Sequence, residues 1–281
     1  MDIHSFASRG DAAGVSKELA KGVPVDARDD QDYTPLAYAA KSPSADESML
    51  RLLIESGADV NAGIDESKSF PIGLAACSGN LEEVQFLLDA GANIKFESPK
   101  GYTILINIMH SLHDDERLVP MAEFLVKNGA VIDCETDYGE SSLSVASRMG
   151  RFDAVKLLLD AGADPTPLQW TELMKAVAFG SCRDVQRRLD SGDKLDDRDR
   201  WDRTPWLLTA FVHDITKAKL LHAAGANIND RDRGGDTVLM HCSARGNPEM
   251  LPWLIEIGAG AGKGAREKVT ATKFDENGWF R

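Results

Sequence analysis

Histidines close to carboxylates are the residues of this sequence whose types and spacing suit chemistry. His110 and His113 lie three residues apart, and three acidic residues follow at 114–116. Imidazole nitrogens and carboxylate oxygens can converge on a metal ion such as zinc. No recognisable spacing supplies a fourth ligand, so a polar surface turn is the simpler interpretation. A metal-dependent enzyme built on residues 110–116 is kept only as an alternative.

Two further pairs, His213-Asp214 and His241-Cys242, contain residue types used as catalytic bases and nucleophiles. A nucleophile needs a base within hydrogen-bond reach and a donor that stabilises the oxyanion. In the repeat described below, His213 falls in a turn and Cys242 at a buried small-residue position. Both places favour structural roles, so we expect no catalytic residue and no enzyme activity.

The glycine-rich segment 258–264 has the composition of a phosphate-binding loop but not its spacing. A phosphate loop needs glycine, four residues, and then Gly-Lys-Ser/Thr, so that backbone amides and a hydroxyl hold phosphate and magnesium. Here Lys263 is followed by Gly264. A flexible loop is the simpler interpretation, and we expect no nucleotide, no other cofactor and no metal.

Glycines recur along the chain with a period close to 33 residues. They stand at positions 22, 57, 91, 129, 162, 192, 225 and 258, separated by 35, 34, 38, 33, 30, 33 and 33 residues. Several open the pattern Gly-Ala-polar-apolar, as in GADVNA at 57–62 and GANIND at 225–230. A fixed period of this length is typical of a solenoid built from stacked supersecondary units.

Two short apolar helical stripes precede each of these glycines. The stretch FPIGLAACSGNLEEVQFLLDAG at 70–91 shows both stripes, with a Gly-Asn pair between them. This pattern predicts a helix, a tight turn, a second helix and a loop, with the final glycine in a left-handed conformation at the helix end. We therefore expect an all-α fold.

The repeated stretches resemble the ankyrin repeat, which combines T-P-L-H-x-A-A, an apolar V-x-x-L-L run and G-A-D-V-N. The matching stretches are TPLAYAA (34–40), LLIESGADVNA (52–62), EEVQFLLDAGANI (82–94), AVKLLLDAGADP (154–165), RTPWLLTA (203–210) and LLHAAGANIND (220–230). The resemblance covers nearly the whole chain as about eight repeats. It implies an ankyrin-repeat solenoid of stacked helix-turn-helix units with hairpin-like loops.

Departures from the repeat predict where the stack is irregular. Five extra residues around 110–116 and two around 42–46 are expected in the turns between helices, where a solenoid tolerates insertions. A short connection at 162–171, with two prolines, predicts a boundary near residue 165. The expected parts are a capping repeat at 1–33, acidic repeats at 34–164, repeats rich in aromatic residues and arginine at 165–262, and a cap or truncated repeat at 263–281. Pro252 is expected to distort the last second helix.

Charge is unevenly distributed along the chain. The net charge is −13, made up of −14 for residues 1–167 and +1 for residues 168–281. Such a field repels nucleic acid and anionic membranes and attracts a basic protein surface. No apolar stretch approaches the ~18 residues of a membrane span, and the four cysteines have no metal-binding spacing. We expect a cytoplasmic chain with reduced thiols that is monomeric when free.

The resemblance implies that partners bind a concave face made of loop tips and the ends of first helices. Large aromatic residues and arginine dominate the energetics of such interfaces. The predicted partner-binding residues are Tyr138, Arg148, Trp170, Phe179, Arg200, Trp201, Arg203, Phe211, Arg233 and Arg245. We expect their four Trp and Phe side chains to face solvent, unless the short 162–171 connection shifts the register and buries some of them.

By analogy with short, acidic, stand-alone chains of this kind, we expect a protein-protein interaction module that acts as an inhibitor or a toxin-immunity protein. A scaffold or adaptor fragment that tethers a membrane or cytoskeletal protein is the alternative.

Overall fold

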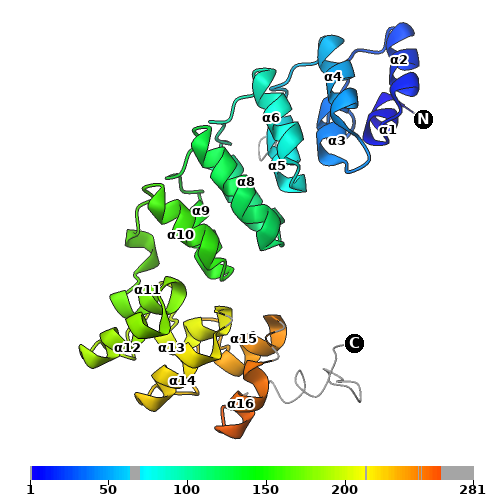
Figure 1. The fold of residues 1–281 in the computed structure, drawn as a ribbon. Coiled ribbons are helices and arrows are strands. Elements are labelled where there is room, and N and C mark those ends of the chain that lie inside the picture. The colour runs from blue at the N-terminus through cyan, green and yellow to red at the C-terminus, as the bar shows by residue number, and fades with distance from the viewer. Residues whose placement is uncertain (1, 64–69, 213, 246, 248, 261–281) are drawn as a thin grey trace, which may run out of the picture. The chain divides into compact units, whose positions relative to one another are not determined.

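The computed structural model describes residues 2–63, 70–212, 214–245, 247 and 249–260. In this part of the chain the regular elements are all helical, which confirms the all-α prediction (Figure 1). The helices are α1 (Ile3–Ser8), α2 (Ala12–Ala20), α3 (Pro35–Lys41), α4 (Glu47–Glu55), α5 (Pro71–Ser78), α6 (Leu81–Asp89), α7 (Ile104–Ser111), α8 (Asp115–Lys127), α9 (Ser142–Arg148), α10 (Phe152–Asp160), η1 (Thr166–Leu168), α11 (Glu172–Phe179), α12 (Cys182–Asp190), α13 (Pro205–Leu208), η2 (Thr209–Phe211), α14 (Ile215–Ala223), α15 (Val238–Arg245) and α16 (Met250–Glu256). Among them, none combines the length and apolar character that a membrane span requires.

In six repeats the first helix begins at a hydroxyl residue. The side-chain oxygen of this residue accepts a hydrogen bond from the backbone N–H three residues further on, which has no partner inside the helix. The residues are Thr34, Thr103, Ser141, Thr171, Thr204 and Thr237. Phe70, at the same position before α5, makes no such bond. The capping hydrogen bond is therefore also present in repeats that have no proline after the threonine.

The second helix of each repeat ends at the recurring glycine. All eight of these glycines have positive φ values, between 79° and 97°. A side chain is strained in this left-handed conformation, so the position selects glycine. The predicted order of helix, turn, helix and loop is confirmed.

Within each unit, the helices contribute buried apolar side chains at equivalent positions to the core. The first helices supply Leu36, Ile72, Leu105, Leu143, Leu173, Trp206 and Leu239, and the second helices supply Leu53, Leu87, Leu125, Leu158, Leu221 and Leu254. Every one of these residues is at most 5% exposed. A single repeat could not bury these side chains alone, because each needs its neighbours on both sides.

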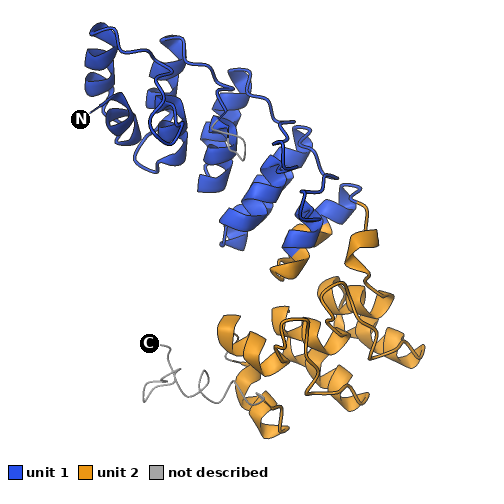
Figure 2. Ribbon diagram, turned by 180° about the vertical axis from the view of Figure 1, so that it is seen from behind, with its two compact units in different colours: residues 1–146, 157–163 blue, residues 147–156, 164–281 orange. Residues whose placement is uncertain are grey.

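The chain divides into two compact units (Figure 2). Unit 1 contains residues 1–146 and 157–163, and unit 2 contains residues 147–156 and 164–281. The segments interleave because parts of α9 and α10 belong to each unit. The four-part division expected from the sequence stays a prediction, and residues 261–281, His213 and the phosphate-loop candidate beyond Gly260 lie outside the described residues.

The insertion at 110–116 extends a helix rather than a turn, so the predicted place was wrong. Helix α8 has 13 residues, whereas α2, α4, α6, α10, α12 and α14 each have 9. Only residues 112–114 separate α7 from α8, because Asp114 caps α8 through the N–H of Glu116. The polar loop required for the metal-site alternative is therefore largely helical.

The expected distortion at Pro252 is also wrong. Pro252 is the third residue of α16, which runs without interruption from Met250 to Glu256. The first four N–H groups of a helix have no acceptor within it, so a proline here removes no helical hydrogen bond.

Two charged side chains are buried at a core position that holds Met or Ala in four other repeats. Eight residues before the recurring glycine, α4, α8, α10 and α16 carry Met or Ala, whereas α6 has Glu83 and α14 has Lys217. Both charged residues are buried. Lys217 Nζ donates a hydrogen bond to the carbonyl of Val177 at 2.8 Å, while burial lowers its pKa. Burial raises the pKa of Glu83 to about 7.

The raised pKa of Glu83 makes stability depend on pH. The folded chain holds the Glu83 proton up to about pH 7, whereas the unfolded chain releases it near the ordinary value of 4.5. This contribution to the free energy of unfolding is complete below that ordinary value and is lost as pH rises through 7.

We predict that Glu83→Gln unfolds with a free energy about 1–3 kcal/mol higher than wild type at pH 8 and nearly equal to it at pH 4.5. Urea unfolding at both pH values measures this difference. An equal effect of the substitution at the two pH values would contradict the assignment.

Candidate functional site

One polar residue holds each of five described loops in shape. It lies five residues before the hydroxyl that caps the next first helix, and its side chain accepts hydrogen bonds from backbone N–H groups further along the loop. These loop-capping residues are Asp29, Ser98, Thr136, Asp199 and Asp232. The residue three positions after each loop-capping residue has a φ between 59° and 83°. The loops therefore share one backbone conformation, and their tips are placed reproducibly.

Asp199 has a second role in unit 2, because it also holds a buried arginine. Its Oδ1 accepts from the N–H groups of Trp201 and Arg203 at 2.8 and 2.9 Å. Its Oδ2 pairs with Arg203 Nη2 at 2.6 Å and Nε at 2.8 Å. The Arg203 guanidinium also donates to the backbone O and to the Oγ of Ser147, at 2.8 and 2.9 Å. Every side of this buried ion pair is thus hydrogen-bonded.

Aromatic rings surround the Arg203 guanidinium. Its central carbon lies 4.9 Å from the Trp201 ring centroid and 5.4 Å from that of Phe211. A second guanidinium, of Arg245, lies 4.4 Å from the Phe211 centroid and donates to the carbonyl of Met149 at 2.8 Å. Cation–π contacts of this kind fix the orientation of both rings.

Phe211 also selects glycine at position 150. A Cβ atom added to Gly150 would lie 2.1 Å from Phe211 Cδ1. The ring therefore packs directly against the backbone of the turn between α9 and α10.

Two residues predicted to face solvent are buried, so their assignment to the exposed face was wrong. Arg203 is 2% exposed because it lies in the ion pair with Asp199. Trp170 is 8% exposed because it packs between Phe152 and Phe179, at centroid distances of 5.3 and 5.5 Å. The indole of Trp170 donates to Asp199 Oδ2 at 3.2 Å. For Trp170, the alternative expectation that some of these aromatic residues are buried is therefore confirmed.

The remaining predicted residues of unit 2 reach the surface. Arg148, Arg233 and Arg245 are exposed, whereas Phe179, Arg200, Trp201 and Phe211 are half-buried. We call these seven residues the Arg–aromatic face. Tyr138 belongs to unit 1, where its side chain is 69% exposed on a loop tip.

The sequence reasoning missed Asp199, on which this arrangement depends. The signal that could have found it is its spacing of five residues from Thr204, which Asp29 and Asp232 repeat ahead of Thr34 and Thr237.

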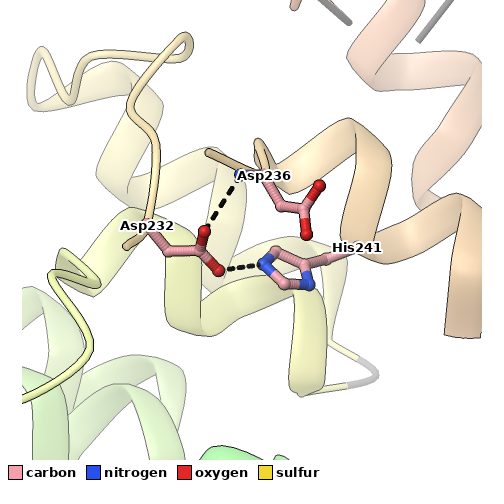
Figure 3. Close-up of side chains that lie close together, drawn as sticks. All are labelled: Asp232, Asp236 and His241. Carbon is pink, nitrogen blue, oxygen red and sulfur yellow. Dashed lines mark hydrogen bonds and ion pairs between the residues drawn. The ribbon is translucent and has the colours of Figure 1, made fainter. Parts of the chain in front are cut away.

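Asp232, Asp236 and His241 form a group whose oxygen and nitrogen atoms lie within 4.8 Å of one another (Figure 3). Three such ligands could hold a cation. However, Asp232 Oδ1 accepts from two loop N–H groups, and Oδ2 lies 2.8 Å from His241 Nε2. In unit 1, Tyr38 at the register position of His241 donates in the same way to Asp29 Oδ2 at 2.7 Å. The shared geometry indicates that this side-chain hydrogen bond serves to link the loop to the first helix.

The residues considered for chemistry have other partners. His110 Nε2 lies 3.2 Å from Glu140 Oε2, and His113 lies in the exposed turn before α8.

Burial raises the pKa of all four cysteine thiols, to about 11 for Cys134 and about 12 for Cys242. A nucleophilic cysteine requires the opposite shift. Cys242 is buried at its small-residue position, as expected.

Models of one repeat family match most of this sequence. A model described as ankyrin repeats (3 copies) matches residues 72–168, one described as ankyrin repeats (many copies) matches residues 213–255, and one described as ankyrin repeat matches residues 31–64. The three matches together cover more than half of the chain.

Similar proteins share these repeats over part of their length. The ankyrin repeat and KH domain-containing protein mask-1 of Caenorhabditis elegans is 26% identical over 81% of this chain and 10% of its own length. The putative ankyrin repeat protein L371 of Acanthamoeba polyphaga mimivirus is 25% identical over 68% and 20%. The putative palmitoyltransferase ZDHHC13 of Danio rerio is 34% identical over 34% and 14%. The chain thus spans a fifth or less of the length of these relatives.

Removing the guanidinium of Arg203 should destabilise unit 2 strongly. Arg203→Ala leaves the Asp199 carboxylate buried beside an empty space, so we predict a loss of about 3 kcal/mol or more in the free energy of unfolding. Arg233→Ala breaks an ion pair with Asp202 whose side chains are 65% and 49% exposed, and it should cost less than about 1 kcal/mol. Chemical denaturation of both variants measures the two losses, and equal losses would contradict the structural role.

Substitution of His241 distinguishes a structural hydrogen bond between loop and helix from a cation site. His241→Tyr preserves the hydrogen bond to Asp232, as Tyr38 does with Asp29, so its stability should match wild type. His241→Phe loses that bond and should cost about 1 kcal/mol. Thermal unfolding with and without zinc provides the measurement. Stabilisation by zinc in wild type that disappears in His241→Tyr would show a cation site instead.

Proposed function

Because this chain belongs to the ankyrin-repeat family, whose repeats are protein-protein interaction modules, we propose that it is a non-catalytic binder that contacts its partner through the Arg–aromatic face. The observation that carries the proposal is the Asp199–Arg203 pair, which holds Trp201 and Phe211 in fixed positions beside exposed arginines. Cytoplasmic location and a monomeric free state belong to the same proposal.

Fixed aromatic rings favour binding because little conformational freedom remains to be lost. Phe211 lies between the guanidinium groups of Arg203 and Arg245, and its ring also touches the backbone at Gly150. Ordering a free side chain at an interface costs about 0.5–1.5 kcal/mol. Preorganisation of Trp201 and Phe211 avoids most of that cost, so the two rings suit the role of anchors at the centre of an interface.

The arginines give the face directional recognition. Arg148, Arg233 and Arg245 are exposed and present planar groups of N–H donors, which match carboxylates and backbone carbonyls of a protein partner. The charge of −14 on residues 1–167 adds a separate, long-range attraction for a basic surface. We therefore propose a protein partner with a basic region, rather than nucleic acid or a membrane.

An inhibitor or toxin-immunity protein is the narrower form of this proposal. Such a protein acts by covering a functional surface of its partner, which needs a stable face and no chemistry of its own. A tether or adaptor would use the same face without blocking its partner. The two roles differ in whether the partner remains active in the complex.

A pull-down with face variants tests the proposal. We predict that Trp201→Ala and Phe211→Ala each weaken binding of a stoichiometric partner by at least about tenfold, because each removes an anchor worth more than about 1 kcal/mol. Phe86→Ala is the matched control, because Phe86 is also half-buried under a guanidinium, that of Arg51 at 4.9 Å, but lies on a second helix.

Circular dichroism should first show that the variants are folded. If both face variants retained every partner, the proposal that partners bind the Arg–aromatic face would be refuted. An assay of partner activity in the wild-type complex then separates the roles, because blocked activity supports an inhibitor and unchanged activity supports a tether.

A further inference from the structure

A hollow in unit 1 lies across the first helices of three successive repeats. Its volume is about 490 Å³, and its lining comes from α3, α5 and α7 together with Tyr102, which precedes α7. Every lining residue belongs to unit 1, and none belongs to the Arg–aromatic face. The hollow is therefore a separate candidate site.

The hollow arises because α5 carries a short side chain where its neighbours carry long ones. Seven residues after the N-cap of the first helix, α5 has Cys77, whereas α3 has Lys41 and α7 has His110. All three residues line the hollow. Lys41 and His110 therefore stand on either side of a shorter side chain, which leaves room between them.

The lining is rich in hydrogen-bond donors and contains no carboxylate. Within the described part of the chain, three of its polar groups make no hydrogen bond and no ion pair: the ammonium of Lys41, the hydroxyl of Tyr102 and the side-chain amide of Asn107. These groups are available to a ligand that carries acceptor atoms.

Two of the lining side chains are held in place from outside the hollow. The ammonium of Lys41 lies 5.2 Å from the centroid of the Tyr33 ring. His110 Nε2 lies 3.2 Å from Oε2 of Glu140, which is not part of the lining. Little reorganisation is needed before these side chains meet a ligand.

The charge of the lining is opposite to that of its surroundings. Residues 1–167 carry a net charge of −14, yet the hollow has a lysine, a histidine and no acidic residue. A carboxylate matches this lining, because its two oxygens accept several hydrogen bonds at once and pair with an ammonium group. The surrounding field repels a small free anion. A carboxylate should therefore bind best when it belongs to a segment whose other residues are neutral or basic.

We propose that this hollow, which we call the donor pocket, binds the side-chain carboxylate of an acidic residue in an otherwise basic segment of a partner protein. Lys41, Tyr102 and Asn107 donate hydrogen bonds to the carboxylate. This inference rests on the proposed function in taking the ligand to be part of a protein, but its site lies in unit 1, whereas the Arg–aromatic face lies in unit 2.

Affinity selection from a synthetic peptide library tests the donor pocket in the full-length chain. The peptides are acetylated and amidated heptapeptides with lysine at both ends, mixed inner positions, and glutamate, glutamine, lysine or phosphoserine at the centre. We expect the wild type to enrich glutamate-centred over glutamine-centred peptides by about tenfold, because a hydrogen bond to a charged group is stronger than one to a neutral group. Mass spectrometry of the retained peptides provides the ratio.

Two variants and a matched control assign the preference to the donor pocket. Lys41→Gln should reduce the preference for glutamate at least about fivefold. Lys17→Gln is the control, because it removes the same charge from an exposed lysine of α2 in unit 1 and should leave the ratio unchanged. Cys77→Met fills the hollow without changing the charge, and the long side chains of Lys41 and His110 show that this register position tolerates it. Retention of glutamate-centred peptides should fall in this variant, and thermal unfolding should show that the fold is kept.

The contrary outcomes are distinct from those of the partner-binding proposal. Equal enrichment of glutamate and glutamine by the wild type, or an unchanged ratio in Lys41→Gln, would overturn the donor pocket. Higher enrichment of phosphoserine would overturn the carboxylate ligand, and equal retention of lysine-centred peptides would show only a general attraction to an acidic chain. Trp201→Ala, which alters the Arg–aromatic face, should leave the peptide ratio unchanged, and its loss there would overturn the assignment to unit 1.

Discussion

Hydrogen bonding between one side chain and the backbone of its own loop is the interaction on which the rest of the structure depends. At Asp29, Ser98, Asp199 and Asp232 the side chain accepts from the N–H groups two and four residues further on. The following first helix starts five residues later, at a capped threonine. Because the loop is fixed at one end and the helix at the other, helix pairs can stack with a constant register and bury a core that no single pair could form.

Unit 2 adds a buried charge to this framework. The same carboxylate that shapes the loop at 199–203 also pairs with Arg203, so loop geometry and ring positions are coupled through Asp199. Desolvating two charges is costly, and it is offset here because the guanidinium also has both acceptors on Ser147. The buried ion pair therefore supports the half-buried rings and exposed arginines nearby. Few side chains of this surface would need to change conformation when a partner binds.

The sequence was sufficient to predict the features set within one repeat. The period of the glycines and the two helical stripes are local, and the structure reproduces them. Features set between repeats were not predictable in this way. Arg203 is buried by Ser147, 56 residues away, and Trp170 donates to Asp199, 29 residues away. The insertion at 110–116 lengthened α8 because Asp114 and the acidic residues after it suit a helix start, a local signal that the repeat pattern obscured.

The buried charges at one core position give individual repeats an identity. Lys217 is satisfied only where the carbonyl of Val177 faces it, and Glu83 occupies the same position in unit 1, where burial raises its pKa. If a repeat were to stack on the wrong neighbour during folding, the Lys217 ammonium would lose its acceptor inside an apolar layer. In an array of similar units with mainly apolar cores, such residues therefore disfavour stacking in the wrong order.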